Sequence, residues 1–435
     1  MHVAAATTLL PPPQTLFPSD LSSRYISRLK SIPTNLLLPS LPFPQPSPEE
    51  PASPRSLAHL RHLLSDSSHH PSPHRPIPTR WRELHGSSDW SGLLDPLDSD
   101  LRRELLRYGD FIHSAYEAFL HPPTGAATHD ARTVLFPDPS YRLTRHLFAT
   151  ASFNLPPSWP SHGSSWIGFV AVCDNEREIR RMGRRDILIA LRGTSTFLEW
   201  AENLRANLVP LASPNLKVEC GFRNLYHSPG VRVPSLSAAV SEEIQRLAEL
   251  YRYEELSITV TGHSLGAALA LLVANDLITT CSNMSKSPPV AVFSFGGPRV
   301  GNRAFAESVE RRGVKVLRVV NKHDLVTKIP GEFGGWWEGY EHVGRELRVD
   351  SRVSPFLKPN ADPGCCHDLE AYLHLVDGLG GGKGCEFRTD AKRSLVRLLS
   401  HQRGNMKKLY VSEASALGAV PGASAYSGCF ASLFS

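Results

Sequence analysis

Long apolar runs are missing from this chain. Within its 435 residues no uncharged apolar stretch reaches the roughly 18 to 20 residues that a membrane-crossing helix needs. We therefore expect no transmembrane helix. Charge is also modest, with 20% charged residues and a formal net charge of +5. Proteins that bind nucleic acid are usually far more basic, so nucleic acid is not expected as a partner.

Cysteine is sparse and shows no pattern. The chain holds seven cysteines, an odd number, and none of them form a Cys-x-x-Cys pair. Disulfide scaffolds and structural zinc sites usually have even numbers or paired spacings. We therefore predict neither a disulfide framework nor a metal site, no cofactor, and a reducing compartment.

Acidic residues are nearly absent from the first 48 positions. This segment contains one acidic residue, Asp20, and three basic residues, Arg24, Arg28 and Lys30. A serine-rich, acid-poor and weakly basic N-terminus is typical of an organelle transit peptide. Proline-rich sequence follows and continues as a linker, so we predict a transit peptide and linker over residues 1–79. Chloroplast and mitochondrial transit peptides share this composition, so it does not distinguish the two organelles. The alternative to a transit peptide is a disordered N-terminus with no targeting role.

The remaining chain alternates between strand-like and helix-like patterns. This alternation predicts a single α/β domain over residues 80–410, with a mainly parallel central sheet flanked by helices. Residues 411–435 are predicted to be a flexible tail, because from Ala414 onward no side chain is charged. Apolar runs predict strands at Ser165–Val172 (the first strand), Asp186–Arg192, Leu256–Thr261, Pro289–Phe295 and Lys315–Val320. Periodic patterns predict helices at Pro96–Phe119, Ser237–Tyr251 and Ala391–Leu399 and one starting at His367, and charged Asp174–Arg185 is predicted to be a hairpin-like turn.

One stretch organises this domain. Alternating β-branched residues lead into Gly262-His263-Ser264-Leu265-Gly266, and small apolar residues follow. This is the Gly-x-Ser-x-Gly pattern in its context of strand, sharp turn and helix, which is typical of the α/β-hydrolase fold. The turn presents the Ser264 hydroxyl above the sheet, and the helix start offers N–H groups to a developing oxyanion.

A serine nucleophile needs a base and an orienting carboxylate, in the chain order Ser, acid, His. Asp324 directly follows a predicted strand and is the best acid. His367 lies at a loop-to-helix junction and is the preferred base, whereas His374 lies inside a helix between leucines, where a packing role is expected. Thr194 ends an upstream strand and can supply a second oxyanion N–H, although an ordinary strand-ending turn would look similar.

Large apolar residues follow Thr194 closely. Phe197 and Trp200 on a short segment beside the site predict a mobile lid that covers apolar surface in water and releases it at a lipid interface. The alternative is a short helix whose aromatic residues belong to the core.

The motifs resemble those of class 3 lipases. The resemblance rests on Thr261–Ala270, Leu191–Thr194, Phe295–Asn302 and Val320–Pro330, and more narrowly on Trp81–Gly86, Asp89–Asp98 and His367–Asp377. The last three are similar to the plant phospholipase A1 family, in particular its plastid-targeted branch.

This resemblance implies roles for individual residues. Ser264, Asp324 and His367 would form the catalytic triad, Thr194 and Leu265 would supply the oxyanion donors, and residues 196–201 would form the lid. The implied substrates are membrane glycerolipids, phospholipids or galactolipids, cut at the sn-1 ester at a lipid interface. The polyunsaturated acids that are released would feed jasmonate synthesis.

Two other functions are compatible with the sequence. A lipase-like signalling module could keep the fold without turnover, although the intact Ser264, Asp324 and His367 argue against it. An acyltransferase would use the same acyl-enzyme with an alcohol as the acceptor. Sequence alone does not separate hydrolysis from transfer, because the difference is which nucleophile reaches the acyl-enzyme.

Overall fold

The protein is described by a computed structural model, and all the described residues belong to one unit, Ala52–Ser435. The predicted lid residues Phe197 and Trp200, the predicted helix at Ala391–Leu399 and the predicted tail lie outside the described residues, as does the predicted transit segment before Ile77. The structure describes residues 77–120, 133–151, 163–194, 207–281, 287–331, 339–354, 357, 366–380 and 387.

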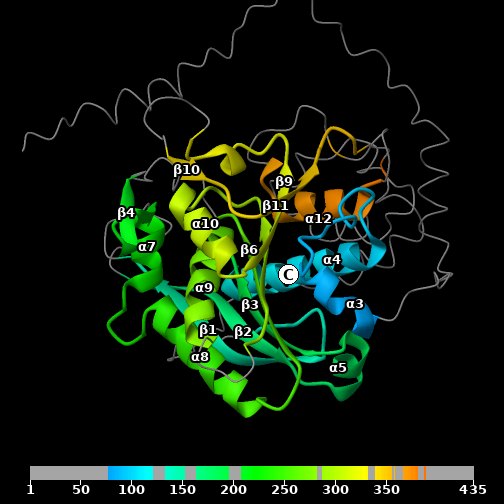
Figure 1. Ribbon diagram of the computed structural model, residues 1–435, viewed down its shortest axis with the longest axis horizontal. Helices are drawn as coiled ribbons and strands as arrows, with labels where there is room; N and C mark the ends of the chain where they lie inside the picture. Colours follow the sequence, from blue (N-terminus) through cyan, green and yellow to red (C-terminus); the bar gives the residue numbers. More distant parts are fainter. Residues whose placement is uncertain are drawn as a thin grey trace, which may run out of the picture. The chain divides into compact units, whose positions relative to one another are not determined.

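A seven-stranded sheet forms the centre of the described unit (Figure 1). In sheet order its strands are β1 (Tyr141–Thr150), β2 (Ser164–Cys173), β3 (Arg185–Leu191), β6 (Leu256–His263), β7 (Val290–Phe295), β9 (Lys315–Asn321) and β11 (Arg345–Val349). Neighbouring strands are parallel from β3 to β11, whereas β2 pairs antiparallel with both β1 and β3. The carboxyl ends of the parallel strands therefore lie along one edge, where ligands bind in sheets of this kind.

Helices cover both faces of the sheet. Figure 1 shows one group of helices beside β1–β3 and β6, namely α8 (Leu236–Leu250), α9 (Leu265–Cys281) and α10 (Arg303–Arg311). The opposite side carries α3 (Ile77–Leu84), α4 (Ser99–Leu120) and α12 (Leu369–Gly378). This layered arrangement around a mainly parallel sheet confirms the predicted α/β-hydrolase fold. None of the helices within the described ranges is both long and apolar enough to cross a bilayer.

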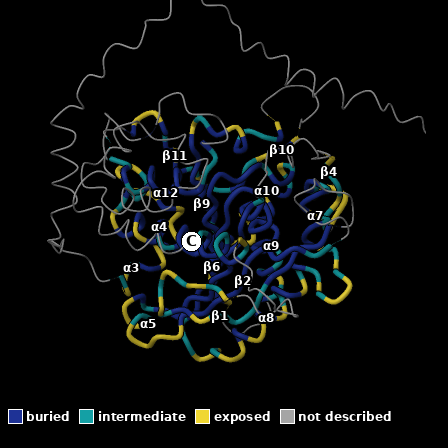
Figure 2. Tube along the Cα trace, turned by 180° about the vertical axis from the view of Figure 1, so that it is seen from behind, coloured by how far each residue is buried: buried dark blue, intermediate teal, exposed yellow. Residues whose placement is uncertain are grey.

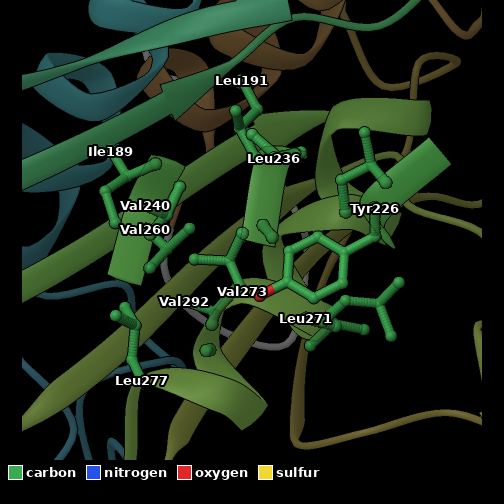
Figure 3. Packing of buried hydrophobic residues seen from close by; sticks show 14 of the residues in the cluster. Ile189, Leu191, Tyr226, Leu236, Val240, Val260, Leu271, Val273, Leu277 and Val292 are labelled. Atoms are coloured by element: carbon green, nitrogen blue, oxygen red, sulfur yellow. The ribbon is translucent and has the colours of Figure 1, made fainter. Parts of the chain in front are cut away.

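The larger core lies between the sheet and the helices α8 and α9. Helix α9 is apolar on nearly every side because the sheet covers one face and α8 packs on another. In Figure 3, Ile189, Val260 and Val292 from the sheet gather in one cluster with Val240 of α8 and Leu277 of α9. Each fully buried aliphatic side chain of this kind contributes roughly 1.5–3 kcal/mol to folding.

Burial is deepest where the nucleophile motif lies. Figure 2 shows buried backbone along β6, β9 and α9, and exposed residues toward α5 (Glu176–Met182) and the outer loops. Every residue of β6 is buried. Strands of a parallel sheet that is covered on both faces are rich in β-branched and other apolar residues, which is why the sequence located β3, β6, β7 and β9.

A second, smaller sheet was not predicted. Its order is β10-β8-β5-β4 and its pairing is antiparallel. These strands are too short for a clear alternating pattern, so the sequence did not indicate them. The bounds are β4 (Leu208–Ser213), β5 (Leu216–Glu219), β8 (Gly301–Asn302) and β10 (Tyr340–Glu341), with α7 (Cys220–His227) following β5 and the 3₁₀ helix η1 (Val326–Lys328) following β9.

Two predictions before β3 were wrong. The strand predicted as the first is β2, because β1 precedes it and pairs with it antiparallel. The charged segment between β2 and β3 is the helix α5, not a hairpin-like turn. Asn175 caps α5 by accepting the N–H groups of Arg177 and Glu178, and Gly183 ends it with a φ of 74°. These capping residues were the missed signal.

The predicted helix at Pro96–Phe119 begins three residues later than expected. Helix α4 starts at Ser99, and Pro96 lies outside it. Asp98 supplies the cap, because its Oδ1 accepts the N–H groups of Asp100 at 2.8 Å and Leu101 at 3.2 Å. The predicted start of this helix was therefore wrong, although the periodic apolar residues of α4, among them Leu101, Leu105 and Ile112, are buried in the core.

Candidate active site

Ser264 occupies a strained turn between β6 and α9. Its φ of 58° is positive, a conformation that residues other than glycine rarely adopt. The flanking glycines leave space for this turn. A Cβ on Gly262 would lie 2.4 Å from the carbonyl of Gly266, and a Cβ on Gly266 would lie 2.3 Å from the carbonyl oxygen of Leu191. A larger residue at position 262 would therefore collide with the first turn of α9, and one at position 266 would collide with the end of β3.

The segment after β3 passes over Ser264. A Cβ on Gly193 would lie 2.8 Å from the Cβ of Ser264, so Gly193 is in close contact with the turn. The next residue, Thr194, has a buried hydroxyl that forms no hydrogen bond within the described residues, and the same is true of the Ser264 hydroxyl. Buried hydroxyls normally have partners, so two such groups on segments that contact each other through Gly193 indicate a place where a polar substrate atom can bind.

The side chains of His367 and Asp324 are hydrogen-bonded to each other near the carboxyl ends of the parallel strands. Asp324 follows β9 and is fully buried, and His367 immediately precedes the cap of α12. The Nδ1 of His367 lies 2.7 Å from Oδ2 of Asp324. Because a carboxylate only accepts, Nδ1 carries the proton, and the Nε2 of a neutral His367 is left as the acceptor. This is the tautomer that a general base requires.

The Asp324 carboxylate has two further partners. The Tyr372 hydroxyl donates to Oδ2 at 2.5 Å, and the N–H of Val326 donates to Oδ1 at 2.8 Å. Burial, and next the charge of Asp324, raise the pKa of Tyr372 well above its ordinary value, so Tyr372 remains a donor. Tyr372 was not predicted. Its position one helical turn beyond His367 was the available signal.

The His263 ring connects the serine turn with His367. Its Nε2 lies 2.8 Å from the carbonyl oxygen of His367, its Nδ1 lies 2.8 Å from the Tyr116 hydroxyl, and the two imidazole rings are 4.7 Å apart. Burial, and next the charge of His367, hold the pKa of His263 well below its usual range. His263 is therefore neutral, and its two hydrogen bonds hold the turn in place.

The other described histidines after Ser264 have different partners. His374 is buried and bonds to the Ser354 hydroxyl at 2.6 Å. The side chain of His323 contacts Asp350, and His342 bonds to the carbonyl of Thr327. Among the described histidines, His367 is the one in contact with Asp324. The structure thus places Asp324 and His367 in direct contact, and it joins His263, which precedes Ser264, to the His367 carbonyl. Gly193, which precedes Thr194, lies against Ser264, and Leu265 directly follows Ser264. The Ser264 hydroxyl itself forms no hydrogen bond within the described residues.

Comparison with known proteins identifies the family. Residues 188–334 match the family described as Lipase (class 3). The chain is 46% identical to phospholipase A(1) DAD1, chloroplastic, of Arabidopsis thaliana, across 73% of this chain and 80% of that protein. The chain belongs to the class 3 lipases. It falls in their plant phospholipase A1 group, and it is an enzyme that hydrolyses carboxylic esters of lipids.

Two further relatives in this group are less similar to the chain in sequence. Galactolipase DONGLE, chloroplastic, of Arabidopsis thaliana is 38% identical across 69% of this lipase and 70% of that protein. Phospholipase A1-II 4 of Oryza sativa subsp. japonica is 37% identical across 77% of this lipase and 89% of that protein. Among solved structures, the lipase from Rhizopus microsporus var. chinensis aligns with a TM-score of 0.42 and 25% identity, covering 59% of this lipase and 76% of that chain.

Buried histidines predict how the stability of this lipase depends on pH. Burial lowers the pKa of both His85 and His374 from 6.5 to about 3. Between these values the unfolded chain binds protons that the folded chain excludes. The free energy of unfolding should therefore fall as the pH drops below 6.5, by up to about 1.4 kcal/mol per pH unit for each histidine.

Urea unfolding of the parent and of His374→Gln at pH 7 and pH 5 measures this effect. The variant should lose less stability than the parent between the two pH values. An identical loss in both proteins would contradict a neutral, buried His374.

Proposed function

We propose that this lipase releases fatty acids from the sn-1 position of membrane glycerolipids through the triad Ser264, Asp324 and His367. The observation that carries the proposal is the 2.7 Å contact between Nδ1 of His367 and the buried Asp324, beside a serine in a strained turn. Support for phospholipid and galactolipid substrates comes from the relatives named phospholipase A1 and galactolipase.

The first half of the proposed reaction forms an acyl-enzyme. His367 Nε2 takes the hydroxyl proton while Ser264 Oγ attacks the ester carbonyl. Negative charge develops on the carbonyl oxygen and is stabilised by the N–H groups of Thr194 and Leu265. The N–H of Leu265 is suited to this role, because Leu265 begins α9 and has no carbonyl acceptor one turn earlier. The ester C–O bond then breaks, and the leaving lysolipid oxygen takes the proton from His367.

The second half regenerates the enzyme. Water gives a proton to His367 Nε2 and attacks the acyl carbonyl. The Ser264 ester bond then breaks, Ser264 Oγ takes the proton back from His367, and a free fatty acid is released. Asp324 stays ionised throughout and stabilises the imidazolium that forms twice in each cycle. When the released acid is polyunsaturated, we propose that it feeds jasmonate synthesis.

We further propose that the carboxyl edge of the sheet meets the lipid surface. Leu325 directly follows Asp324, Val353 follows β11, and their exposed fractions are 41% and 38%. Apolar side chains that are exposed around a site suit contact with a membrane more than contact with water. The predicted lid residues Phe197 and Trp200 would add to this surface.

The substrate proposal is tested with vesicles. The purified full chain is incubated with phosphatidylcholine or monogalactosyldiacylglycerol that carries a labelled acyl chain at either sn-1 or sn-2. We expect labelled free acid from the sn-1-labelled lipid and labelled lysolipid from the sn-2-labelled lipid. The reverse pattern would contradict the positional preference. Labelled ester of an added alcohol in place of free acid would indicate an acyltransferase, and no product would indicate a silent module.

We propose the chloroplast as the location of this lipase. The support is the acid-poor N-terminus together with two relatives whose names contain the word chloroplastic. Fluorescent protein fused behind residues 1–79 should accumulate in chloroplasts of a plant cell. A mitochondrial or uniformly cytosolic signal would contradict this proposal.

A further inference from the structure

Gly193 is held at both of its backbone polar groups. Its N–H donates to the Tyr116 hydroxyl at 2.8 Å, and its carbonyl accepts from Nη1 of Arg192 at 2.6 Å. Both partners are close: a Cβ on Gly193 would lie 2.5 Å from the Tyr116 hydroxyl. The residue in contact with Ser264 therefore has its two flanking peptide groups fixed by side chains.

The carbonyl of Gly193 and the N–H of Thr194 belong to the same peptide group. In a planar trans peptide these two groups point in opposite directions. Fixing the Gly193 carbonyl through Arg192 therefore also sets the direction of the Thr194 N–H. Glycine leaves the backbone torsions on both sides of its Cα freer than any other residue would. The bond from the Gly193 N–H to Tyr116 therefore restricts a position that is otherwise mobile.

The same hydroxyl of Tyr116 reaches the serine turn. A carbonyl can only accept, so the His263 Nε2 that contacts the His367 carbonyl must carry the proton. Because His263 is neutral, its Nδ1 accepts, and the Tyr116 hydroxyl is the donor at 2.8 Å. The remaining lone pairs of that hydroxyl accept the Gly193 N–H. Donor and acceptor roles thus have one consistent assignment across Gly193, Tyr116, His263 and His367.

We propose that Tyr116 is a positioning residue for the oxyanion hole. Its hydroxyl ties the peptide between Arg192 and Gly193 to His263 and, through His263, to the backbone of His367. Together with the contact of Arg192 on the next peptide, this bond holds the Thr194 N–H in position before substrate binds. Donors that are oriented in advance stabilise a transition state without the cost of reorganisation. This inference rests on the proposed triad and oxyanion donors, but it adds a residue from α4 that lies 147 positions before His263.

Replacing Tyr116 by phenylalanine removes this hydroxyl and little else. Loss of a whole oxyanion donor typically costs 10²- to 10³-fold in kcat, so loss of its orientation should lower kcat by about 10- to 100-fold. KM should change by no more than about twofold, because the ground-state ester uses this donor weakly. A trifluoromethyl ketone forms an oxyanion adduct with serine, and its affinity should weaken by the same factor as kcat.

Tyr108→Phe is the matched control. Tyr108 lies on the same helix and is fully buried. Its hydroxyl donates to Glu104 at 3.2 Å, a residue outside the proposed site. This variant should lose stability while its kcat and ketone affinity stay near those of the parent. Equal losses of kcat in the two variants would reduce Tyr116 to a structural residue and overturn the proposal.

A second substitution keeps the proposal testable if Tyr116→Phe does not fold. His263→Leu removes both the acceptor for the Tyr116 hydroxyl and the donor to the His367 carbonyl, because the leucine side chain has no polar atom. This variant should lower kcat and ketone affinity together, and in the double variant Tyr116→Phe should add little, because both changes break one network. Additive losses would contradict the network.

The failure of this inference can be told apart from failure of the proposed function. An unchanged kcat and ketone affinity in folded Tyr116→Phe, with Ser264→Ala inactive, overturns the role of Tyr116 alone. Esterase activity that persists in Ser264→Ala overturns the proposed triad.

Discussion

Replacing Ser264 by alanine is expected to reduce turnover by about 10⁴-fold or more on every ester that this lipase cleaves. Without the hydroxyl no acyl-enzyme forms, and any remaining rate comes from water attacking an ester held in the oxyanion hole. The backbone should hardly change, because the strain at the positive φ of Ser264 is similar for alanine. The measurement is kcat on a soluble short-chain ester, with the melting temperature as the check on folding.

Substrate binding separates loss of chemistry from loss of structure in this variant. Ser264→Ala should still bind lipid vesicles as the parent does, because the hydroxyl is buried and forms no hydrogen bond within the described residues. A folded Ser264→Ala enzyme that retains more than about 1% of parental kcat would show that another group is the nucleophile.

Replacing His367 by alanine should cause a loss of comparable size, on the order of 10⁴-fold or more in kcat. The Ser264 hydroxyl would then have no base, and Asp324 would lose the imidazole that lies 2.7 Å from it. The loss in the double variant Ser264→Ala with His367→Ala should be close to that of either single variant, because the residues act as one unit. Asp324→Asn should cost as much or less, since it disturbs the tautomer but leaves the nucleophile in place.

His374→Ala is the matched control for His367→Ala. Both remove an imidazole from the same short region, but His374 is buried inside α12 and contacts Ser354. This control should lose stability, by roughly 1–3 kcal/mol for a buried polar contact and packing volume, and should keep most of its turnover. If His374→Ala is inactive and His367→Ala is active, the assignment of the base is wrong.

The parts of the fold that were predictable are those with strong local patterns. The strand β7 is almost entirely apolar, β6 alternates apolar with small polar residues, β9 is mostly apolar, and α8 shows an apolar stripe, so each was located to within a residue or two. Capping chemistry was harder to recognise. Asn175 and Gly183 bound a seven-residue helix whose charged sequence had suggested a turn. The short strands of the small sheet are defined by pairing between distant segments, which no local pattern contains.

The residues of the candidate site likewise divide into those that a local sequence pattern marks and those that it does not. Ser264 is marked by glycines that are close in sequence and required by the turn, and Asp324 and Thr194 follow recognisable strands. Tyr116 lies in the predicted helix Pro96–Phe119, and nothing local indicates that its hydroxyl contacts Gly193 and His263.

The sequence by itself determined the main strands from β2 to β9 of the central sheet, the long helices α4 and α8, the position of the serine turn and a short set of acids and bases. These features depend on neighbours in the chain: side-chain periodicity, the steric demand of a turn, and the residues that follow strand ends. The tertiary structure alone decided which histidine contacts Asp324, that Tyr372 donates to Asp324, and that Tyr116 bonds to Gly193 and His263. Those contacts join α4, the turn after β6, the loop after β9 and the start of α12, and their distances depend on how the helices pack on the sheet.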